Sequence, residues 1–149
     1  MDPADTSQQK AGSVSPVRLL PDSEILAVAH LKASADIIAL VGTRVGTELY
    51  AGTEPAIWLS LVTGDERFRN HLAAPMLDVR SYGGNKGQAS TLSRTVHAVM
   101  HAMPGVHAQG VVTSMRCLTL PAWNPDDGFT PPRARFLASY EITLHPTPT

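Results

Sequence analysis

The sequence contains a single cysteine, Cys117, among 149 residues. One thiol cannot form an intramolecular disulfide, so we expect a fold that does not depend on an oxidising compartment. The count also excludes structural zinc sites built on two to four cysteines. We interpret Cys117 as a small buried side chain in a strand, because no histidine motif near it indicates an activated nucleophile.

Aromatic residues are few, the net charge is close to zero, and the sequence has no long apolar run. Aromatic residues make up 5% of the chain, so the core must be built mainly from Leu, Val, Ile and Ala. The formal net charge of −1 argues against a sequence-specific nucleic-acid partner, because such proteins usually carry a basic stripe. No run approaches the roughly 20 apolar residues of a membrane span, and residues 1–5 do not resemble a signal peptide. We therefore expect no membrane partner.

What remains is the composition of one folded domain, with 43% hydrophobic and 17% charged residues. Residues 1–21 are rich in Ser, Gln, Asp, Pro and Gly, which predicts a flexible N-terminal arm. Residues 22–146 form the predicted domain, and residues 147–149 a short C-terminal tail.

Two helices are predicted. Asp22 or Ser23 can cap the first, which should fade between residues 36 and 41. The second covers residues 88–103, where apolar residues recur at the spacing of one helical stripe. This stripe consists of Ala89, Leu92, Val96, Met100 and Met103.

Four strands are predicted, at residues 55–62, 76–82, 111–120 and from 135 onward, with a short irregular strand at residues 44–50. In the last strand, Phe136, Ala138, Tyr140, Ile142 and Leu144 share one face. We expect this face to pack against the stripe of the second helix. The fold class is then α+β: a mostly antiparallel sheet of about four strands with two main helices packed on one face.

Several patterns resemble catalytic or metal-binding motifs. His97 and His101 have a chelating spacing, but Ala98 replaces the glutamate of the HExxH motif, and we interpret them as a pair at the boundary of the core. Ser7 and Lys10 match SxxK only within the predicted arm, where no fixed geometry is expected.

Two loops also resemble known sites. Residues 83–87 (GGNKG) lack the spacing of a phosphate-binding P-loop and favour a strand-to-helix turn with positive φ. Asp126 and Asp127 lie in a sequence typical of a turn. We therefore predict no catalytic residue, no cofactor and no metal site, and a protein that is not an enzyme.

Charged residues supply the candidate partner interface. Residues 63–70 are predicted to be an exposed loop or hairpin tip. Two arginines at the entry to the last strand could bind phosphate or carboxylates of a partner, or could be a solvated edge that opposes aggregation. The candidate residues are Asp65, Glu66, Arg67, Arg69, Arg133 and Arg135.

Five segments, in order, carry a resemblance to a known family. They are Leu40-Val41-Gly42-Thr43-Arg44-Val45; Pro55-Ala56-Ile57-Trp58-Leu59; Val79-Arg80-Ser81-Tyr82-Gly83, followed by a helix containing Ala89; Leu120-Pro121; and Pro132-Arg133-Ala134-Arg135-Phe136. Over residues 22–145 their order and spacing resemble the tail terminator (tail completion) proteins of long-tailed phages, including those once called minor tail proteins.

The resemblance implies an α+β subunit of a hexameric ring that caps the tail tube, ends its polymerisation and joins the tail to the head or neck. The implied partners are other copies of the chain, the tail tube protein and a head–tail connector or neck protein, with genomic DNA able to pass through the ring. The implied location is the head-proximal end of the tail in the virion, after synthesis in the host cytoplasm.

Other functions stay open at this stage. Head-closure or stopper proteins of the neck have related topology and similar size. A small-ligand-binding or enzymatic α+β domain would need a pocket with convergent polar groups. A cellular adaptor domain would bind peptides at a sheet edge.

Overall fold

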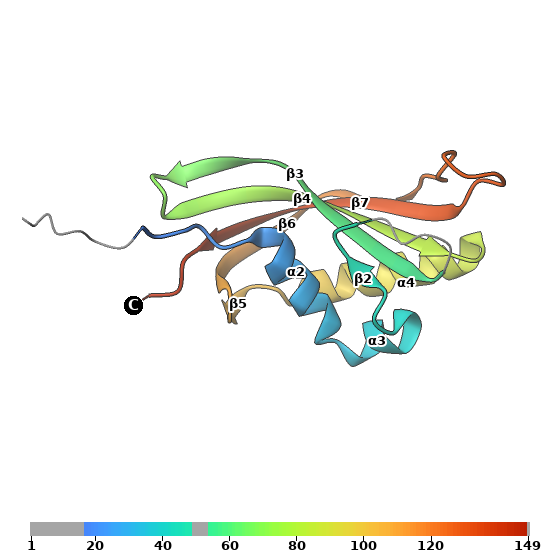
Figure 1. The fold of residues 1–149 in the computed structure, drawn as a ribbon, viewed down its shortest axis with the longest axis horizontal. Helices are drawn as coiled ribbons and strands as arrows, with labels where there is room; N and C mark the ends of the chain where they lie inside the picture. The colour runs from blue at the N-terminus through green and yellow to red at the C-terminus, as the bar shows by residue number, and fades with distance from the viewer. Residues whose placement is uncertain (1–16, 49–53, 149) are drawn as a thin grey trace, which may run out of the picture.

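The computed structural model describes residues 17–48 and 54–148, as one domain (Figure 1). Most of the predicted arm, including Ser7 and Lys10, lies outside these residues, as does the end of the strand expected at 44–50. The elements are α2 (Ser23–Lys32), α3 (Ala35–Val41), β2 (Val45–Gly46), β3 (Ala56–Phe68), β4 (Leu72–Gly83), α4 (Lys86–Met100), β5 (Gly105–His107), β6 (Gly110–Trp123) and β7 (Ala134–His145).

The strands form one sheet in the order β2-β3-β4-β7-β6-β5. β2 runs parallel to β3, and the other neighbouring strands are antiparallel. All three helices lie on one face (Figure 1). The expected α+β fold, with a four-stranded antiparallel sheet and two helices, is therefore wrong: the chain forms a six-stranded mixed sheet, a half-barrel, with three helices.

The differences arise where the sequence signal is short. β2 and β5 have two and three residues, too few to show an alternating pattern. The first predicted helix is two helices, because Ser34 adopts an extended conformation and its hydroxyl accepts a hydrogen bond from the Ile37 N–H, which starts α3. Asp22 caps α2 as expected, through the Ile25 N–H at 3.1 Å.

The core lies between the helices and the sheet. Leu92, Val96 and Met100 of α4 are buried in one cluster with Tyr140 and Ile142 of β7, which confirms their predicted packing. Phe136 differs, because it is half-buried and its ring contacts Trp123, with centroids 5.6 Å apart.

The loop predicted at residues 63–70 is mostly strand, since β3 continues to Phe68 and pairs with β4. Only residues 69–71 form a turn, so the hairpin tip is confirmed and the longer loop is wrong. Alternation of side chains cannot reveal this extension, because every side chain from residue 61 to 71 is exposed.

The turn at residues 83–87 has a different cause from the expected one. Among the described glycines, positive φ occurs at Gly42 and Gly105 and not in this turn. Gly83 is instead required by close approach: a Cβ there would lie 2.9 Å from Ala89 Cα in the first turns of α4. Asn85 caps α4 by accepting from the Gln88 N–H at 2.8 Å.

Among residues 17–48 and 54–148, no helix has the length and apolar composition of a membrane span.

Candidate assembly surfaces

The candidate interface residues form two groups at opposite ends of the sheet. Asp65, Glu66, Arg67 and Arg69 lie in and beside the far end of β3, at the tip of the β3–β4 hairpin. Arg133 and Arg135 lie at the start of β7, next to the end of β4, where Tyr82 pairs with Arg135. One compact partner could not contact both groups through the same short surface (Figure 1).

The hairpin charges are partly engaged within the chain. Arg67 Nη2 lies 3.4 Å from Glu141 Oε2, and Arg116 Nη2 lies 3.1 Å from Glu141 Oε1. One carboxylate of β7 thus pairs with cations from β3 and β6. Glu66 closes the tip by accepting from the Asn70 N–H at 2.7 Å. Asp65 Oδ2 lies 3.9 Å from Arg67 Nε. Its side chain is 74% exposed, so Asp65 is the most open to a partner among these ion-paired residues.

Arg133 and Arg135 point into the chain instead of toward solvent, since their side chains are 9% and 18% exposed. Arg133 forms an ion pair with Glu54, and its guanidinium lies over the rings of Tyr82 and Phe129, 4.5 and 4.7 Å from their centroids. Cations placed over aromatic rings in this way are stabilised by the ring quadrupole.

Arg135 holds the loop between β6 and β7. Its Nη2 donates to Asn124 Oδ1 at 2.6 Å, and its Nη1 lies 3.4 Å from Asp126 Oδ2. Asp126 also accepts from the Gly128 N–H at 3.0 Å, the turn chemistry expected from the sequence. These contacts give the two arginines a structural role, and their contact with a partner stays a prediction.

The electrostatics of this loop follow from its contacts. Burial alone would raise the pKa of Asp126, but the Gly128 N–H, the Tyr82 hydroxyl and the arginine charges lower it below its ordinary value. Burial raises the pKa of Tyr82, so that its hydroxyl stays protonated and donates to Asp126.

Two strand edges, on opposite sides of the sheet, carry no strand partner over most of their length in the part of the chain described. β2 pairs with β3 only at Ile57 and Trp58, and β5 pairs with β6 only at residues 110–112. One backbone N–H of the β3 edge already has a partner within the chain, because the Leu61 N–H donates to Glu24 Oε2 at 2.8 Å. Open edges of this length are templates for pairing with another chain.

Both edge strands also expose large apolar side chains. The exposed fraction is about half or more for Leu61, Val62 and Phe68 of β3, and 67% for Leu120 of β6. Sequence reasoning missed these residues because it looked for charge. Alternation along β6 does not predict them either. Bulges between Cys117 and Thr119 and between Thr119 and Ala122 shift the register after Met115 and Cys117, which pack against the core.

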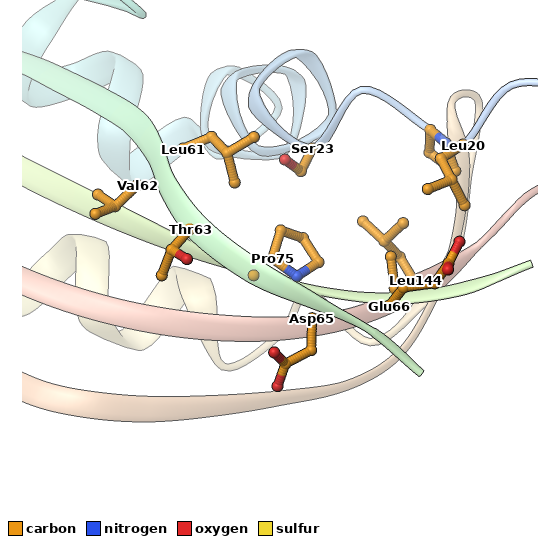
Figure 2. Close-up of a pocket in the computed structure, with 12 residues that line it drawn as sticks. Leu20, Ser23, Leu61, Val62, Thr63, Asp65, Glu66, Pro75 and Leu144 are labelled. Atoms are coloured by element: carbon orange, nitrogen blue, oxygen red, sulfur yellow. The ribbon is translucent and has the colours of Figure 1, made fainter. Parts of the chain in front are cut away.

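An open groove of about 580 Å³ lies between β3 and the segment that precedes α2 (Figure 2). Leu61, Pro75 and Leu144 lie on the side of β3 that faces α2 and Leu20, whereas Asp65 points away. The walls are mainly apolar, and the groove brings together no nucleophile and base. It can accept an apolar side chain or peptide segment.

The remaining candidates lie apart from these surfaces. His97 is half-buried and His101 exposed, which places the pair at the core boundary as expected, with their Nε2 atoms 3.1 Å apart. Cys117 is half-buried and not fully buried as expected, and this partial burial raises the pKa of its thiol, which favours the unreactive form. Within the described ranges, no three histidine, cysteine or carboxylate residues gather as metal ligands do.

Comparison with known proteins adds a likeness of fold. No family model matches the sequence, and no curated protein matches it. A chain of a solved structure described as "Virion of native gene transfer agent (GTA) particle" superposes with a TM-score of 0.57 at 16% identity. The match covers 83% of this chain and 94% of that chain, so the two share essentially the whole fold.

Proposed function

We propose that this chain is a structural protein of a virion, where copies of it form a ring, of six subunits, at the head-proximal end of a tail. The ring caps the tail tube, ends its polymerisation and joins the tail to the head or neck. Its partners are other copies of the chain, the tail tube protein and a connector or neck protein, and genomic DNA passes through the ring.

The observation that carries the proposal is the likeness to a chain of a virion particle. It extends over 94% of that chain, so it concerns a whole subunit and not a common substructure. The resemblance of the sequence to tail terminator proteins rests on different grounds, namely the residues at the joints between elements. Both lines of support favour a virion component.

The two open edges favour a ring. β3 and β6 expose their edges on opposite sides of the same sheet, so they cannot pair with each other within one chain. If the β6 edge of one copy adds to the β3 edge of the next, the contact is heterologous, and a rotation that closes on itself then produces a ring. Leu61 and Val62 of one copy and Leu118 and Leu120 of the next would then be covered.

The same surfaces support the proposal of a structural role in place of catalysis. The exposed features are strand edges, a hairpin tip and an apolar groove, all suited to contacts between proteins. The polar groups gathered at Tyr82, Asp126 and Arg135 bond to one another and hold a loop.

The test is to mix the purified chain with growing tail tubes and to image them by negative stain. The expected result is a ring at one end of each tube and a length that no longer increases when tube subunits are added. Reversing the charges of Asp65, Glu66, Arg67 and Arg69 together should weaken this capping if the hairpin tip meets the tube. Tubes that elongate unchanged and bear no ring would overturn the proposal.

A head-closure or stopper protein is the alternative with a related shape. Cryo-electron microscopy of intact virions distinguishes the two by position. A terminator contacts the last ring of tube subunits, whereas a stopper lies on the head side of the neck and does not contact the tube.

A further inference from the structure

The six histidines of the chain lie in three pairs, and in one pair two ring nitrogens meet. The pairs are His30 with His107, His71 with His145, and His97 with His101. Only the last brings a nitrogen of each ring within hydrogen-bond distance of the other, at 3.1 Å between the Nε2 atoms. In the other two pairs the rings either bond to backbone carbonyls or lie stacked on each other.

The rings of His30 and His107 are committed to backbone carbonyls. His30 Nε2 lies 2.7 Å from Val99 O, and His107 Nε2 lies 2.6 Å from Met103 O, so both nitrogens carry hydrogen. His71 and His145 are stacked, with 18° between their planes. Their lone pairs lie in nearly parallel planes and cannot meet at one ion.

The spacing at His97 and His101 fits a shared metal ion. Zinc binds imidazole nitrogen at about 2.0–2.1 Å, so two nitrogens 3.1 Å apart would subtend an angle of about 100° at the ion. This angle lies between those of square and tetrahedral coordination. The residues stand four apart at the end of α4, so both rings project from the same side of the helix.

Tyr140 orients one of the two rings. Its hydroxyl lies 2.9 Å from His97 Nδ1, and burial raises the pKa of Tyr140, so the hydroxyl stays neutral. When Nδ1 carries hydrogen and donates to this oxygen, the Nε2 lone pair of His97 faces His101. Metal-binding histidines almost always bond through their second nitrogen in this way.

We propose that His97 and His101 bind a divalent ion of the late first-row metals, such as Zn²⁺, Ni²⁺ or Cu²⁺, through their Nε2 atoms. Imidazole suits these ions. No third ligand of the described chain completes the site, so solvent fills the other positions. Because His101 caps the C-terminal end of α4, chelation fixes the last turn of that helix. The inference does not rest on the proposed ring.

The experiment is a titration of the untagged, full-length protein with Zn²⁺, followed by the imidazole nitrogen resonances in NMR. The expected result is that His97 and His101 shift first and saturate at one ion per chain. His101→Gln, at an exposed position, should lower the affinity about tenfold or more. Tyr140→Phe keeps both ligands and the buried ring, and should weaken binding by about 10–100-fold.

His71→Gln is the matched control, since it removes a histidine from the stacked pair and should leave the Zn²⁺ affinity unchanged. Circular dichroism shows that each variant is folded before titration. The proposal is overturned if Zn²⁺ leaves the resonances of His97 and His101 in place, or if His101→Gln binds Zn²⁺ as tightly as the parent chain.

Discussion

The Tyr82 hydroxyl donates to Asp126 Oδ2 across 2.9 Å, although the two residues are 44 positions apart in the sequence. Tyr82 lies near the end of β4, and Asp126 in the loop between β6 and β7, where it also forms an isolated bridge with Arg133. The contact therefore holds a protruding loop against the sheet. Arg135 lies beside both groups and neutralises the carboxylate.

Tyr82→Phe should destabilise the chain by about 1–3 kcal/mol, because it removes one donor from a largely buried, charged acceptor while the ring keeps its packing against Arg133. Chemical denaturation measures the change in the free energy of unfolding. Arg94→Ala, at an exposed position of α4, is the control and should change the stability little. Equal stability of Tyr82→Phe and the parent chain would show that the hydroxyl contributes nothing.

The lowered pKa of Asp126 predicts a loss of stability in acid. The folded state holds this carboxylate ionised below its ordinary pKa of about 3.9, so its contribution is fully present above that value. It is lost as the pH falls through the lower, folded-state pKa, because the unfolded chain binds the proton more readily. Denaturation of the parent chain and of Asp126→Asn between about pH 2 and 7 should show a stability difference that shrinks toward the acid end. A difference that is constant over this range would contradict the assignment.

Leu92→Ala should destabilise the chain by about 2–5 kcal/mol, because Leu92 is fully buried between α4 and the sheet and its truncation leaves a cavity. Thermal or denaturant unfolding measures the loss. The exposed neighbour Thr91 offers the comparison, since Thr91→Ala should remain close to the parent chain. If both variants unfold at the same midpoint as the parent, Leu92 cannot lie in the core.

Gly83→Ala should also destabilise, by about 1–3 kcal/mol, the cost of forcing extra atoms into a packed region. The added Cβ would meet the backbone of Gln88 and Ala89, which cannot rotate away as a side chain could. Gly46→Ala is the matched control, because its Cβ would have no neighbour closer than 4.0 Å. Comparison of the two melting midpoints separates close packing from a general effect of replacing glycine.

The sequence predicts those parts of the fold in which burial repeats with a clear period. The stripe of α4 and the buried face of β7 each have four or more apolar residues at the right spacing, and both are confirmed. β2 and β5 are too short for any period, and their places depend on pairing with β3 and β6. The break between α2 and α3 depends on one serine, Ser34, whose capping role becomes visible only when its backbone is known.

The candidate surfaces were harder to predict because charge does not show where a side chain points. Arg133 and Asp65 look alike as exposed charges in the sequence, yet the first is covered by Tyr82 and Phe129 and the second is open. The open edges result from the strand order, which no local pattern encodes. The pairing of Tyr82 with Asp126 likewise spans a distance in sequence that motif reasoning does not reach.

Substitution of one apolar side chain on each edge tests the proposed ring contact. Leu120→Lys and Val62→Lys each place a charge where a neighbouring edge strand would pack, and the exposed fractions of 67% and 50% mean that the isolated chain tolerates the change. We expect each variant to keep its stability to within about 0.5 kcal/mol and to lose ring formation on tubes. Unfolding curves and negative-stain images provide the two measurements.

Ile38→Lys is the matched control for these edge variants. Ile38 is an apolar side chain of α3 that is 39% exposed, and α3 packs against α2 and α4 instead of the open edges. If pairing of edges builds the ring, this variant forms rings normally although it carries the same added charge. If Leu120→Lys and Val62→Lys also form normal rings, the edges are not the contact. Loss of rings in all three variants would point to added charge itself, since a contact made through β3 and β6 leaves the exposed face of α3 uncovered.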